Sequence, residues 1–472
     1  MTVRKIGLVT TLLLLSYAAS VAQQKQPPNI IFILADDLGV GDLGVYGQQK
    51  IATPHLDQLA KEGMMMSQFY TGSPVCAPSR ATLMTGLHTG HAPIRGNKAT
   101  PPEGQWPLPQ NSLTIAEVLK DAGYATGDFG KWGMGFVGTT GDPNKQGFDA
   151  FYGYNCQSLA HNYFPDYLWQ NDKKIKLQNT SQQQNDYAAD LIQNQAQQFI
   201  KDHSRKPFFL FLSYTLPHAA LQLPENDSLF TYYRKLFNEK PVPVPPNWTG
   251  KGYQPQAYPH AAYAAMVGKL DAYVGQIKAE IEQLGLGSNT IILFASDNGP
   301  HAEGGNDPEF FNSSGGLKGI KRDLYEGGIR TPLIAWWPGR IRAGSQSAYV
   351  GAFWDLLPTF AELAGADQPT GVDGISFVPE LLGKSPQKKH TYLYWEFHEQ
   401  GGKQAVRLDN WKGVRLGVME NPDAAIELYN LVNDPSEQNN IAAAHPDIVK
   451  KIAAIMKDAH VENEDFPFLP AK

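Results

Sequence analysis

Four runs of about strand length, mainly apolar, each lead into polar residues, and this repeated pattern limits the fold more than any other feature of the chain. The runs cover 29–35, 124–130, 207–213 and 290–296. Strands that are hydrophobic at nearly every position are buried on both faces, as in a parallel sheet between helices. We therefore predict an α/β fold in which a mixed, mostly parallel sheet lies between layers of helices.

Polar side chains follow these runs close to the points where the strands would end. They are Asp36, Asp37, Lys131, His218, Asp297 and Asn298. The carboxyl ends of parallel strands lie along one edge of a sheet, and ligands bind at that edge. We therefore expect these side chains, which come from distant parts of the chain, to form one site.

The rest of the pattern predicts helices between the strands and a change of structure near residue 375. Helices are predicted over 53–60, 112–122 and 260–284, and irregular insertions around the site over much of 154–260. Short strands are predicted over 391–397, 403–408, 411–416 and 426–428, and a helix over 446–459. We therefore expect a large domain over 23–375 and a C-terminal subdomain over 376–472, which has a small antiparallel sheet and one helix.

Residues 1–22 have the features of a secretory signal peptide. Arg4 and Lys5 precede an apolar stretch over 6–19, and Ser20-Val21-Ala22 is suitable for cleavage. The stretch is too short to predict a stable membrane span, and an uncleaved anchor is the alternative interpretation. We therefore predict an exported protein, either periplasmic or secreted. The net charge of −6 gives no indication of a nucleic-acid partner.

Cys76 begins the most specific motif of the chain, Cys76-x-Pro78-x-Arg80. Pro78 suits the first turn of a helix, so we expect Cys76 just before a helix N-terminus, where backbone N–H groups and the helix dipole favour an anion. The other cysteine is Cys156. Two cysteines in an exported protein permit a disulfide, but we interpret Cys156 as a buried free thiol.

Four of the polar residues at the strand ends have the composition of a metal site. Asp36, Asp37, Asp297 and Asn298 offer three carboxylates and one amide oxygen. Such a hard, oxygen-only ligand set suits Ca²⁺, or Mg²⁺ in a tighter site. The alternative is that both pairs are ordinary turn residues that follow strands.

The motif at Cys76, which continues to Thr85-Gly86, resembles the signature of type I sulfatases, in which the cysteine is oxidised to formylglycine. Two further segments support the resemblance, namely Gly130-Lys131-Trp132-Gly133 and Lys321 before Tyr325-Glu326-Gly327-Gly328. The resemblance covers about 28–435 and implies an alkaline-phosphatase-like fold. It also implies that a formylglycine-generating enzyme matures the protein, and that Cys76 and the four oxygen donors hold a divalent cation.

The resemblance implies a role for each matching residue. Arg80 would hold the hydrated formylglycine, and Lys131 and Lys321 would bind sulfate oxygens. His218 would contact the ester oxygen and donate a proton to the leaving alcohol. Lys318 is close to Lys321, but the spacing to Tyr325-Glu326 favours Lys321.

One position departs from the family pattern. Family members usually have a histidine directly after the aromatic residue of the second segment, and this chain has Gly133. That histidine helps sulfate to leave, so Gly133 puts this step in doubt. His161 is our candidate for a replacement, with an ordinary loop histidine as the alternative, and we also predict that His161 and His301 contact the substrate.

These observations together predict an exported sulfatase. A sulfated carbohydrate is the expected substrate because exported enzymes meet extracellular glycans, and an aryl sulfate is a further option. Two alternatives remain at this point. One is a hydrolase of phosphate or phosphonate esters from the same superfamily, and the other is a protein that binds sulfated glycans without cleaving them.

Overall fold

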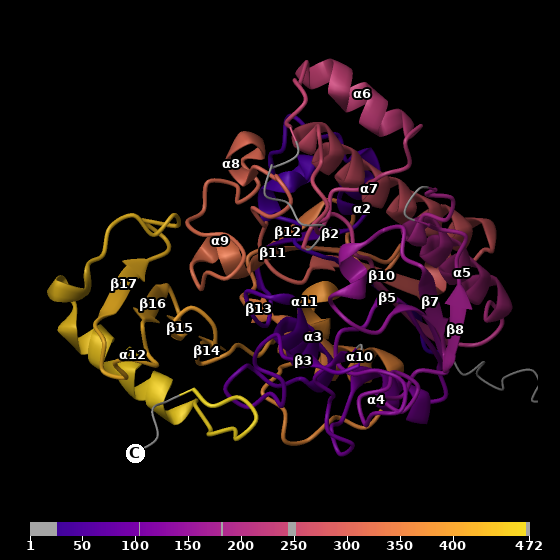
Figure 1. Ribbon diagram of the computed structural model, residues 1–472. Coiled ribbons are helices and arrows are strands. Elements are labelled where there is room, and N and C mark those ends of the chain that lie inside the picture. The colour runs from indigo at the N-terminus through magenta and orange to yellow at the C-terminus, as the bar shows by residue number, and fades with distance from the viewer. Residues whose placement is uncertain (1–25, 103, 181–182, 244–251, 469–472) are drawn as a thin grey trace, which may run out of the picture.

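A computed structural model describes residues 26–102, 104–180, 183–243 and 252–468, and it is built around one large mixed sheet (Figure 1). The predicted signal peptide lies outside the described residues. The strands of the sheet are β1 Asn29–Ala35, β2 Met64–Tyr70, β5 Ala125–Lys131, β6 Ala150–Tyr154, β7 Tyr167–Gln170, β8 Lys173–Lys176, β9 Phe208–Ser213, β10 Thr290–Ser296, β11 Arg330–Trp336, β12 Ser345–Ser347 and β13 Gly351–Ala352. A two-stranded ribbon joins β3 Ala99–Thr100 to β4 Gly104–Gln105.

The order of the strands is β12-β2-β11-β10-β1-β9-β5-β6-β7-β8, and β13 also pairs with β2. The four strands expected from the sequence are the central ones, since β1 pairs in parallel with β9 and β10, and β9 in parallel with β5. Antiparallel pairs are added farther out, where β10 meets β11 and β6 meets β7. The prediction of a mixed, mostly parallel sheet is therefore confirmed.

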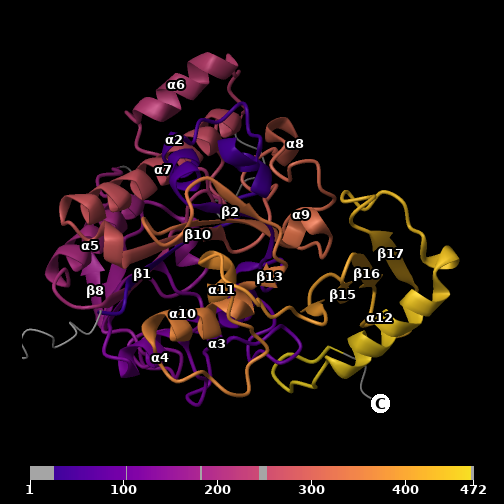
Figure 2. The same ribbon diagram turned by 180° about the vertical axis from the view of Figure 1, so that it is seen from behind.

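Helices cover both faces of this sheet (Figures 1 and 2). The longer helices are α2 Pro54–Glu62, α3 Cys76–Thr85, α4 Ile115–Asp121, α5 Ala188–Asp202, α6 Ser228–Phe237, α7 Pro259–Gln283 and α10 Leu356–Ala364. Three short ones are α8 Pro308–Phe311, α9 Glu326–Ile329 and α11 Val378–Leu381. Alternate residues of β1 enter different cores: Ile31 and Ile33 pack with α2, α5 and α7, whereas Phe32 packs with α3, α4 and α10. This explains why the strand is hydrophobic at every position.

Helix α7 carries the apolar stripe expected from the sequence and also fixes α2. Met266, Leu270 and Ile277 are completely buried. Asp271 on the same helix is buried too, and its carboxylate accepts hydrogen bonds from the backbone N–H groups of His55 and Leu56, at 3.2 and 2.7 Å. These N–H groups belong to the first turn of α2, where a negative charge is favoured.

The prediction of irregular insertions within 154–260 is wrong at helices α5 and α6. Helix α5 occupies 188–202 and buries Ile192, Phe199 and Ile200 in the core against the sheet. Glutamines between the apolar residues hide this stripe in the sequence. Gln195 and Gln198 lie on the exposed face, whereas Gln193 is buried and donates to Gln276 at 2.9 Å.

The C-terminal subdomain has the predicted structure (Figure 2). Strands β14 Leu393–Phe397, β15 Lys403–Leu408, β16 Trp411–Leu416 and β17 Ile426–Asn430 form an antiparallel sheet in that order. Helix α12, Pro446–Asp458, packs Ile452 and Met456 against it. The boundary at 375 stays a prediction, although Phe377 and Leu381 pack in the core of the large sheet.

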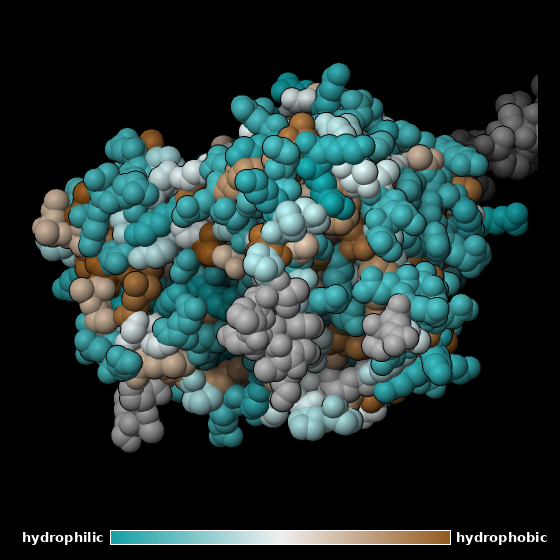
Figure 3. Space-filling model, turned by 45° about the horizontal axis from the view of Figure 1, so that its top comes forward, coloured by the Kyte–Doolittle hydropathy of each residue, from teal (hydrophilic) through white to brown (hydrophobic). Residues whose placement is uncertain are grey.

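The surface agrees with a protein that meets water on its outer face. The side in Figure 3 is mainly hydrophilic, with small hydrophobic areas between polar side chains. None of the helices within the described ranges is long and apolar enough to cross a membrane.

Glu396 joins the C-terminal subdomain to the large domain. Its buried carboxylate accepts hydrogen bonds from Arg95 at 2.9 Å, from His398 at 2.9 Å and from His460 at 2.7 Å. Burial opposes ionisation, but these partners outweigh it and lower the pKa of Glu396 to about 2. The same contact raises the pKa of His460, against the effect of burial.

We expect Glu396→Gln to lower the free energy of unfolding by about 3 kcal/mol, because it removes one member of a buried charge cluster. The carboxylate stabilises the fold fully above its unfolded pKa of about 4.5, and this contribution is lost as the pH falls toward 2. The wild type should therefore lose stability between these values more steeply than the variant. Chemical unfolding at several pH values measures the difference, with exposed Glu464→Gln as control; equal slopes would contradict the assignment.

Candidate active site

The predicted site residues meet at the carboxyl ends of β1, β5 and β10, where helix α3 begins. Cys76 is the first residue of α3, one position further into the helix than expected, and Val75 precedes it as the N-cap. The Cys76 side chain is buried, and its Sγ lies 3.4 Å from Asp36 Oδ1. The first turn of the helix therefore directs its backbone N–H groups and positive dipole end toward the site.

Three carboxylates and three cations alternate around Cys76. Lys131 Nζ lies 2.6 Å from Asp36 Oδ2. Arg80 binds Asp297 through Nε and Nη2, at 3.1 and 2.8 Å, and also donates to the main-chain oxygen of Lys131. A further pair joins Lys321 Nζ to Asp37 Oδ2 at 2.8 Å. All these side chains are buried, so each charge depends on its neighbours for stabilisation.

The end of β1 is locked to the end of β10. Asp37 has a φ of +65°, in the left-handed region, which aspartate tolerates better than most residues. Its N–H donates to Asp297 Oδ1 at 3.1 Å, and Asn298 Nδ2 donates to Asp37 Oδ1 at 2.6 Å. Uncommon backbone conformations of this kind gather at functional sites, where the surrounding contacts hold them.

The carboxyl groups of Asp36 and Asp297 differ in their pKa. Burial opposes the ionisation of Asp36, but the charges of Lys131 and Arg80 outweigh it, and the pKa of Asp36 is lowered. For Asp297, burial and the charge of Asp36 raise the pKa to about 7. A further positive charge beside Asp297 would lower this pKa and favour the ionised carboxylate.

The residues at this point fit a divalent cation. Asn298 Oδ1 is buried and has no hydrogen-bond partner among the residues that the structure describes, although the Nδ2 of the same side chain donates twice. Ligand atoms of Asp36, Asp37, Cys76 and His218 lie within 4.8 Å of one another. Asp36, Asp37, Asp297 and Asn298 would hold the ion through oxygen, as Ca²⁺ and Mg²⁺ prefer. Such an ion supplies positive charge that polarises a bound anion.

Cys76 in its thiol form is poorly suited to catalysis. Burial, followed by the charge of Asp36, raises its pKa well above the ordinary value. The thiolate is the reactive form of cysteine, so a thiol held neutral at this place is a weak nucleophile. Cys156 is buried as well, and it is not joined to Cys76 by a disulfide.

His218 faces both Lys321 and Asp37. Its Nδ1 donates to the main-chain oxygen of Ala219, so Nε2 is free to accept, and Lys321 Nζ lies 3.3 Å from it. Asp37 Oδ2 is 3.4 Å from the same nitrogen. Burial and the charge of Lys321 lower the pKa of His218 well below its usual value, so the ring is neutral.

His161 lies on His218, with the two rings nearly parallel and their centroids 5.0 Å apart. Burial, together with Lys131 and Lys321, lowers the pKa of His161 to about 4. His301 is completely buried, and both of its nitrogens contact main-chain groups: Nε2 lies 3.2 Å from the oxygen of Pro217, and Nδ1 accepts from the N–H of Glu303. Its observed contacts fix two loops, and its contact with substrate stays a prediction.

The structure adds two residues that the sequence did not indicate. Glu303 binds Lys321 at 3.0 Å and Arg322 at 2.6 Å, and these cations lower its pKa to about 2 despite burial. Tyr253 donates to Glu303 at 3.0 Å and packs its ring against His161. Glu303 could have been suspected because it closely follows Asn298 and His301, whereas the segment around Tyr253 carries no such signal.

The structure also distinguishes between the two neighbouring lysines. Lys321 lies in the charge cluster, whereas Lys318 lies 3.2 Å from the Tyr429 hydroxyl and over the ring of Tyr325. Lys321 is therefore the lysine available to an anion bound beside Cys76.

Comparisons with known proteins agree with this geometry. The sulfatase family model matches residues 28–366, and the model of the C-terminal region of N-sulphoglucosamine sulphohydrolase matches 319–463. N-acetylgalactosamine-6-sulfatase of Mus musculus is 33% identical over 402 residues, which is 78% of this chain and 69% of the relative. N-acetylgalactosamine-6-O-sulfatase of Bacteroides thetaiotaomicron is 26% identical and covers 92% of this chain and 93% of its own length.

Solved structures show the same architecture. Ps i-CgsB in complex with k-i-k-neocarrahexaose matches with a TM-score of 0.76 and 29% identity, covering 95% of this chain and 96% of that one. The phosphonate monoester hydrolase of Agrobacterium radiobacter has a TM-score of 0.64 at 19% identity, which shows a shared fold alone. The fold is thus alkaline-phosphatase-like, as predicted, and the chain belongs to the sulfatase family of sulfuric ester hydrolases.

Proposed function

We propose that this protein is an exported sulfatase that hydrolyses a sulfate ester of a carbohydrate. In the proposal, a maturation enzyme converts Cys76 to formylglycine, and Ca²⁺, or Mg²⁺, binds to Asp36, Asp37, Asp297 and Asn298 beside it. One observation carries the proposal: Cys76 lies at the first turn of α3, with Asp36 at 3.4 Å, in a cluster that also contains Lys131 and Arg80. The raised pKa of its thiol supports modification rather than direct attack by sulfur.

Hydrated formylglycine would supply an oxygen nucleophile and a second hydroxyl group on the same carbon, through which sulfate can leave. Lys131 and Lys321 enclose Cys76 from two sides and would bind the sulfate oxygens. Arg80, fixed by Asp297, would orient residue 76. Lys321 and the neutral His218 are close enough to share a proton, which the leaving alcohol requires.

Relatives and neighbours support a carbohydrate substrate. Two curated relatives are named for the 6-sulfate of N-acetylgalactosamine, and one matching structure contains a neocarrahexaose. Hydrolysis of a phosphate or phosphonate ester is the second candidate, since a phosphonate monoester hydrolase shares the fold. The third candidate, a binding protein without catalysis, depends on Gly133.

A side chain at Gly133, as in the family pattern, would need an unfavourable backbone conformation and would have to displace the amide of Gln157. The φ of Gly133 is +78°, and a Cβ at this position would lie 2.7 Å from Gln157 Nε2. Main-chain hydrogen bonds hold the segment of Gly133 beside the segment of Gln157. The N–H of Trp132 donates to the oxygen of Tyr154, and the N–H of Gly133 donates to the oxygen of Asn155. Gln157 Nε2 is buried, and no described residue forms a hydrogen bond with it. The amide of Gln157 is therefore a second candidate to replace the family histidine, separate from His161, which packs on His218.

We expect Gly133→Ala to lower the free energy of unfolding by about 3 kcal/mol, because strain from a positive φ adds to overpacking against Gln157. Gly138→Ala is the matched control, since Gly138 also has a positive φ, of +91°, but nothing within 4 Å of its Cβ position. The control should lose only about 1 kcal/mol. Adding Gln157→Ala to Gly133→Ala should restore part of the loss in chemical unfolding; equal losses in both glycine variants would refute the close approach.

Removal of the proposed nucleophile tests the function. We expect the mature wild type to release sulfate from a sulfated monosaccharide, and Cys76→Ala to be slower by about a thousandfold or more. Ion chromatography measures the sulfate. Matched 4-nitrophenyl sulfate and 4-nitrophenyl phosphate test the second candidate: faster phosphate cleavage would favour it, and undiminished activity of Cys76→Ala would exclude the proposed mechanism.

Metal binding has a readout that does not depend on activity. In the Cys76→Ala protein, Ca²⁺ at about a hundred times its Kd should stabilise the fold by about 2.7 kcal/mol relative to EDTA. Asn298→Ala should reduce this gain, because it removes an oxygen ligand, whereas exposed Asn439→Ala should keep it. Differential scanning calorimetry measures the shift; a gain that is the same with and without Asn298 would contradict the assigned ligands.

A further inference from the structure

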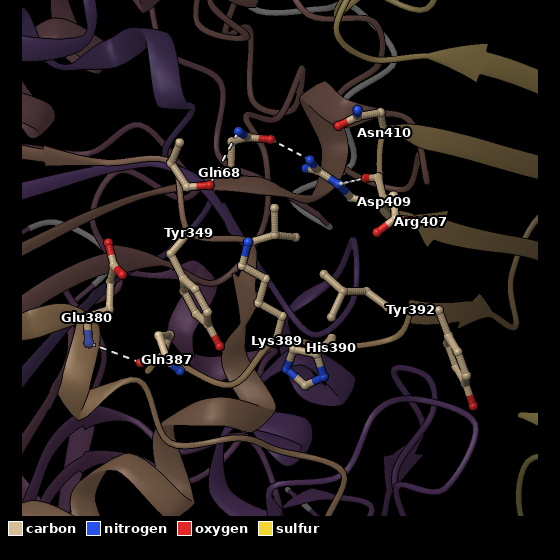
Figure 4. A pocket seen from close by; sticks show the side chains of 13 residues that line it. Gln68, Tyr349, Glu380, Gln387, Lys389, His390, Tyr392, Arg407, Asp409 and Asn410 are labelled. Carbon is tan, nitrogen blue, oxygen red and sulfur yellow. Dashed lines mark hydrogen bonds between the residues drawn. The ribbon is translucent and has the colours of Figure 1, made fainter. Parts of the chain in front are cut away.

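A second pocket, of about 710 Å³, lies between the large domain and the C-terminal subdomain (Figure 4). One wall consists of Gln68 on β2 and the segment 348–350 that precedes β13. The opposite wall consists of the segment 389–393 that leads into β14, with Arg407 on β15. None of the residues of the catalytic cluster lines this pocket. Its volume is in the range of pockets that hold small ligands.

The pocket continues in two directions along the boundary between the domains. A hollow of about 250 Å³ shares Gln68, Arg407 and Asn410 with it. Another hollow, of about 220 Å³, shares Lys389, His390 and Tyr392 with it. The three together form an elongated groove, which suits a chain of several units better than a single compact molecule. We call it the boundary groove.

Two cations in the boundary groove have no carboxylate partner among the described residues. Lys389 is exposed, has no hydrogen bond or ion pair, and extends into the pocket on the side of Arg407 (Figure 4). The buried guanidinium of Arg407 donates to neutral oxygens only: the Tyr70 hydroxyl, Gln68 Oε1 and the main-chain oxygen of Asp409. Glu326 is close enough to interact with Arg407, but its carboxylate is already paired directly with Arg330 and Lys412. Cations that lack a direct carboxylate contact favour an anionic ligand.

The acidic residues that line the groove are placed differently. Asp373, in the hollow beside His390, has its carboxylate 2.9 Å from His91 Nδ1. Glu380 accepts a hydrogen bond from the Ser347 hydroxyl at 2.6 Å, and Figure 4 shows it on the far wall from Arg407. Asp409 is exposed at the turn between β15 and β16. The part of the groove between Lys389 and Arg407 is therefore its positive part.

Aromatic rings and amides complete the lining. Tyr349 and Tyr392 present rings, and Tyr349 is held in place by a stacking contact with Phe377. Gln68, Gln387 and Asn410 present amides. Rings pack against the apolar faces of sugars, and amides bind their hydroxyl groups. With two cations that lack a direct carboxylate contact, this combination matches a carbohydrate that carries sulfate groups.

We propose that the boundary groove is a second binding site, separate from the catalytic cluster, for a chain of sulfated sugars. The identity of the ligand rests on the proposed function, since a sulfatase of glycans would gain from holding the polymer while it cleaves single esters. When one part of a polymer is bound in the groove, the local concentration of its other sugars at the catalytic cluster is raised. The groove should therefore act on the affinity for polymers and leave small substrates unaffected.

Binding in the Cys76→Ala background tests this without turnover. The probes are size-fractionated chondroitin sulfate, heparin and carrageenan, with neutral dextran as the unsulfated control, in affinity electrophoresis at fixed low salt. We expect Lys389→Ala to weaken binding of at least one sulfated probe by about tenfold, the effect of one lost charge contact. Lys388→Ala is the matched control, because Lys388 is an exposed neighbour outside the lining. Tyr392→Ala is a second variant that removes a ring without changing charge, and it should weaken binding too.

Equal affinity in the Lys389 and Lys388 variants, or no binding of any sulfated probe by the parent protein, would overturn the groove proposal. With Cys76 intact, Lys389→Ala should turn over 4-nitrophenyl sulfate at the wild-type rate but show a raised KM for the polymer. If the wild type releases no sulfate from any substrate while Lys389→Ala still weakens binding, the proposed function fails and the groove stands. If the wild type releases sulfate and Lys389→Ala does not change binding, the proposed function stands and the groove proposal fails.

Discussion

The structure depends on a buried cluster of opposite charges at the point where the strand ends meet α3. Burying Asp36, Asp37 and Asp297 alone would cost several kcal/mol per charge, and Arg80, Lys131 and Lys321 offset that cost. The cluster joins segments from residue 36 to residue 321, so it also fixes how the large sheet and α3 fit together. A divalent cation on the carboxylates would release the lysines from these pairs and leave them available to an anion. The same charges can thus stabilise the free protein and bind a sulfate ester.

Sequence and structure agree where local pattern and burial point the same way. The strands at 29–35 and 290–296 were predictable because both faces are covered, and Lys321 was separable from Lys318 by its spacing to Tyr325-Glu326. Helix α5 was missed because glutamines on its exposed face mask the buried stripe. Gln157 and Tyr253 could not be identified from the sequence, because each acquires its position from contacts between distant loops.

The histidines show how strongly the environment controls this site. His218 and His161 are neutral because they are buried beside Lys131 and Lys321, and they stack on each other rather than acting as independent acids. In the proposed mechanism, proton transfer would therefore involve Lys321 together with His218, and a bound anion would change the balance by supplying negative charge. The proposed boundary groove also contains cations, Lys389 and Arg407, that make no direct carboxylate contact within the described part of the chain.

The most direct test of the central claim is the chemical state of residue 76 in active protein. Peptide mass spectrometry of natively exported material should find the aldehyde of formylglycine at this position, at an occupancy that rises with specific activity across preparations. Finding only the intact thiol in fully active protein would contradict the claim, because a buried thiol with a raised pKa cannot supply the nucleophile.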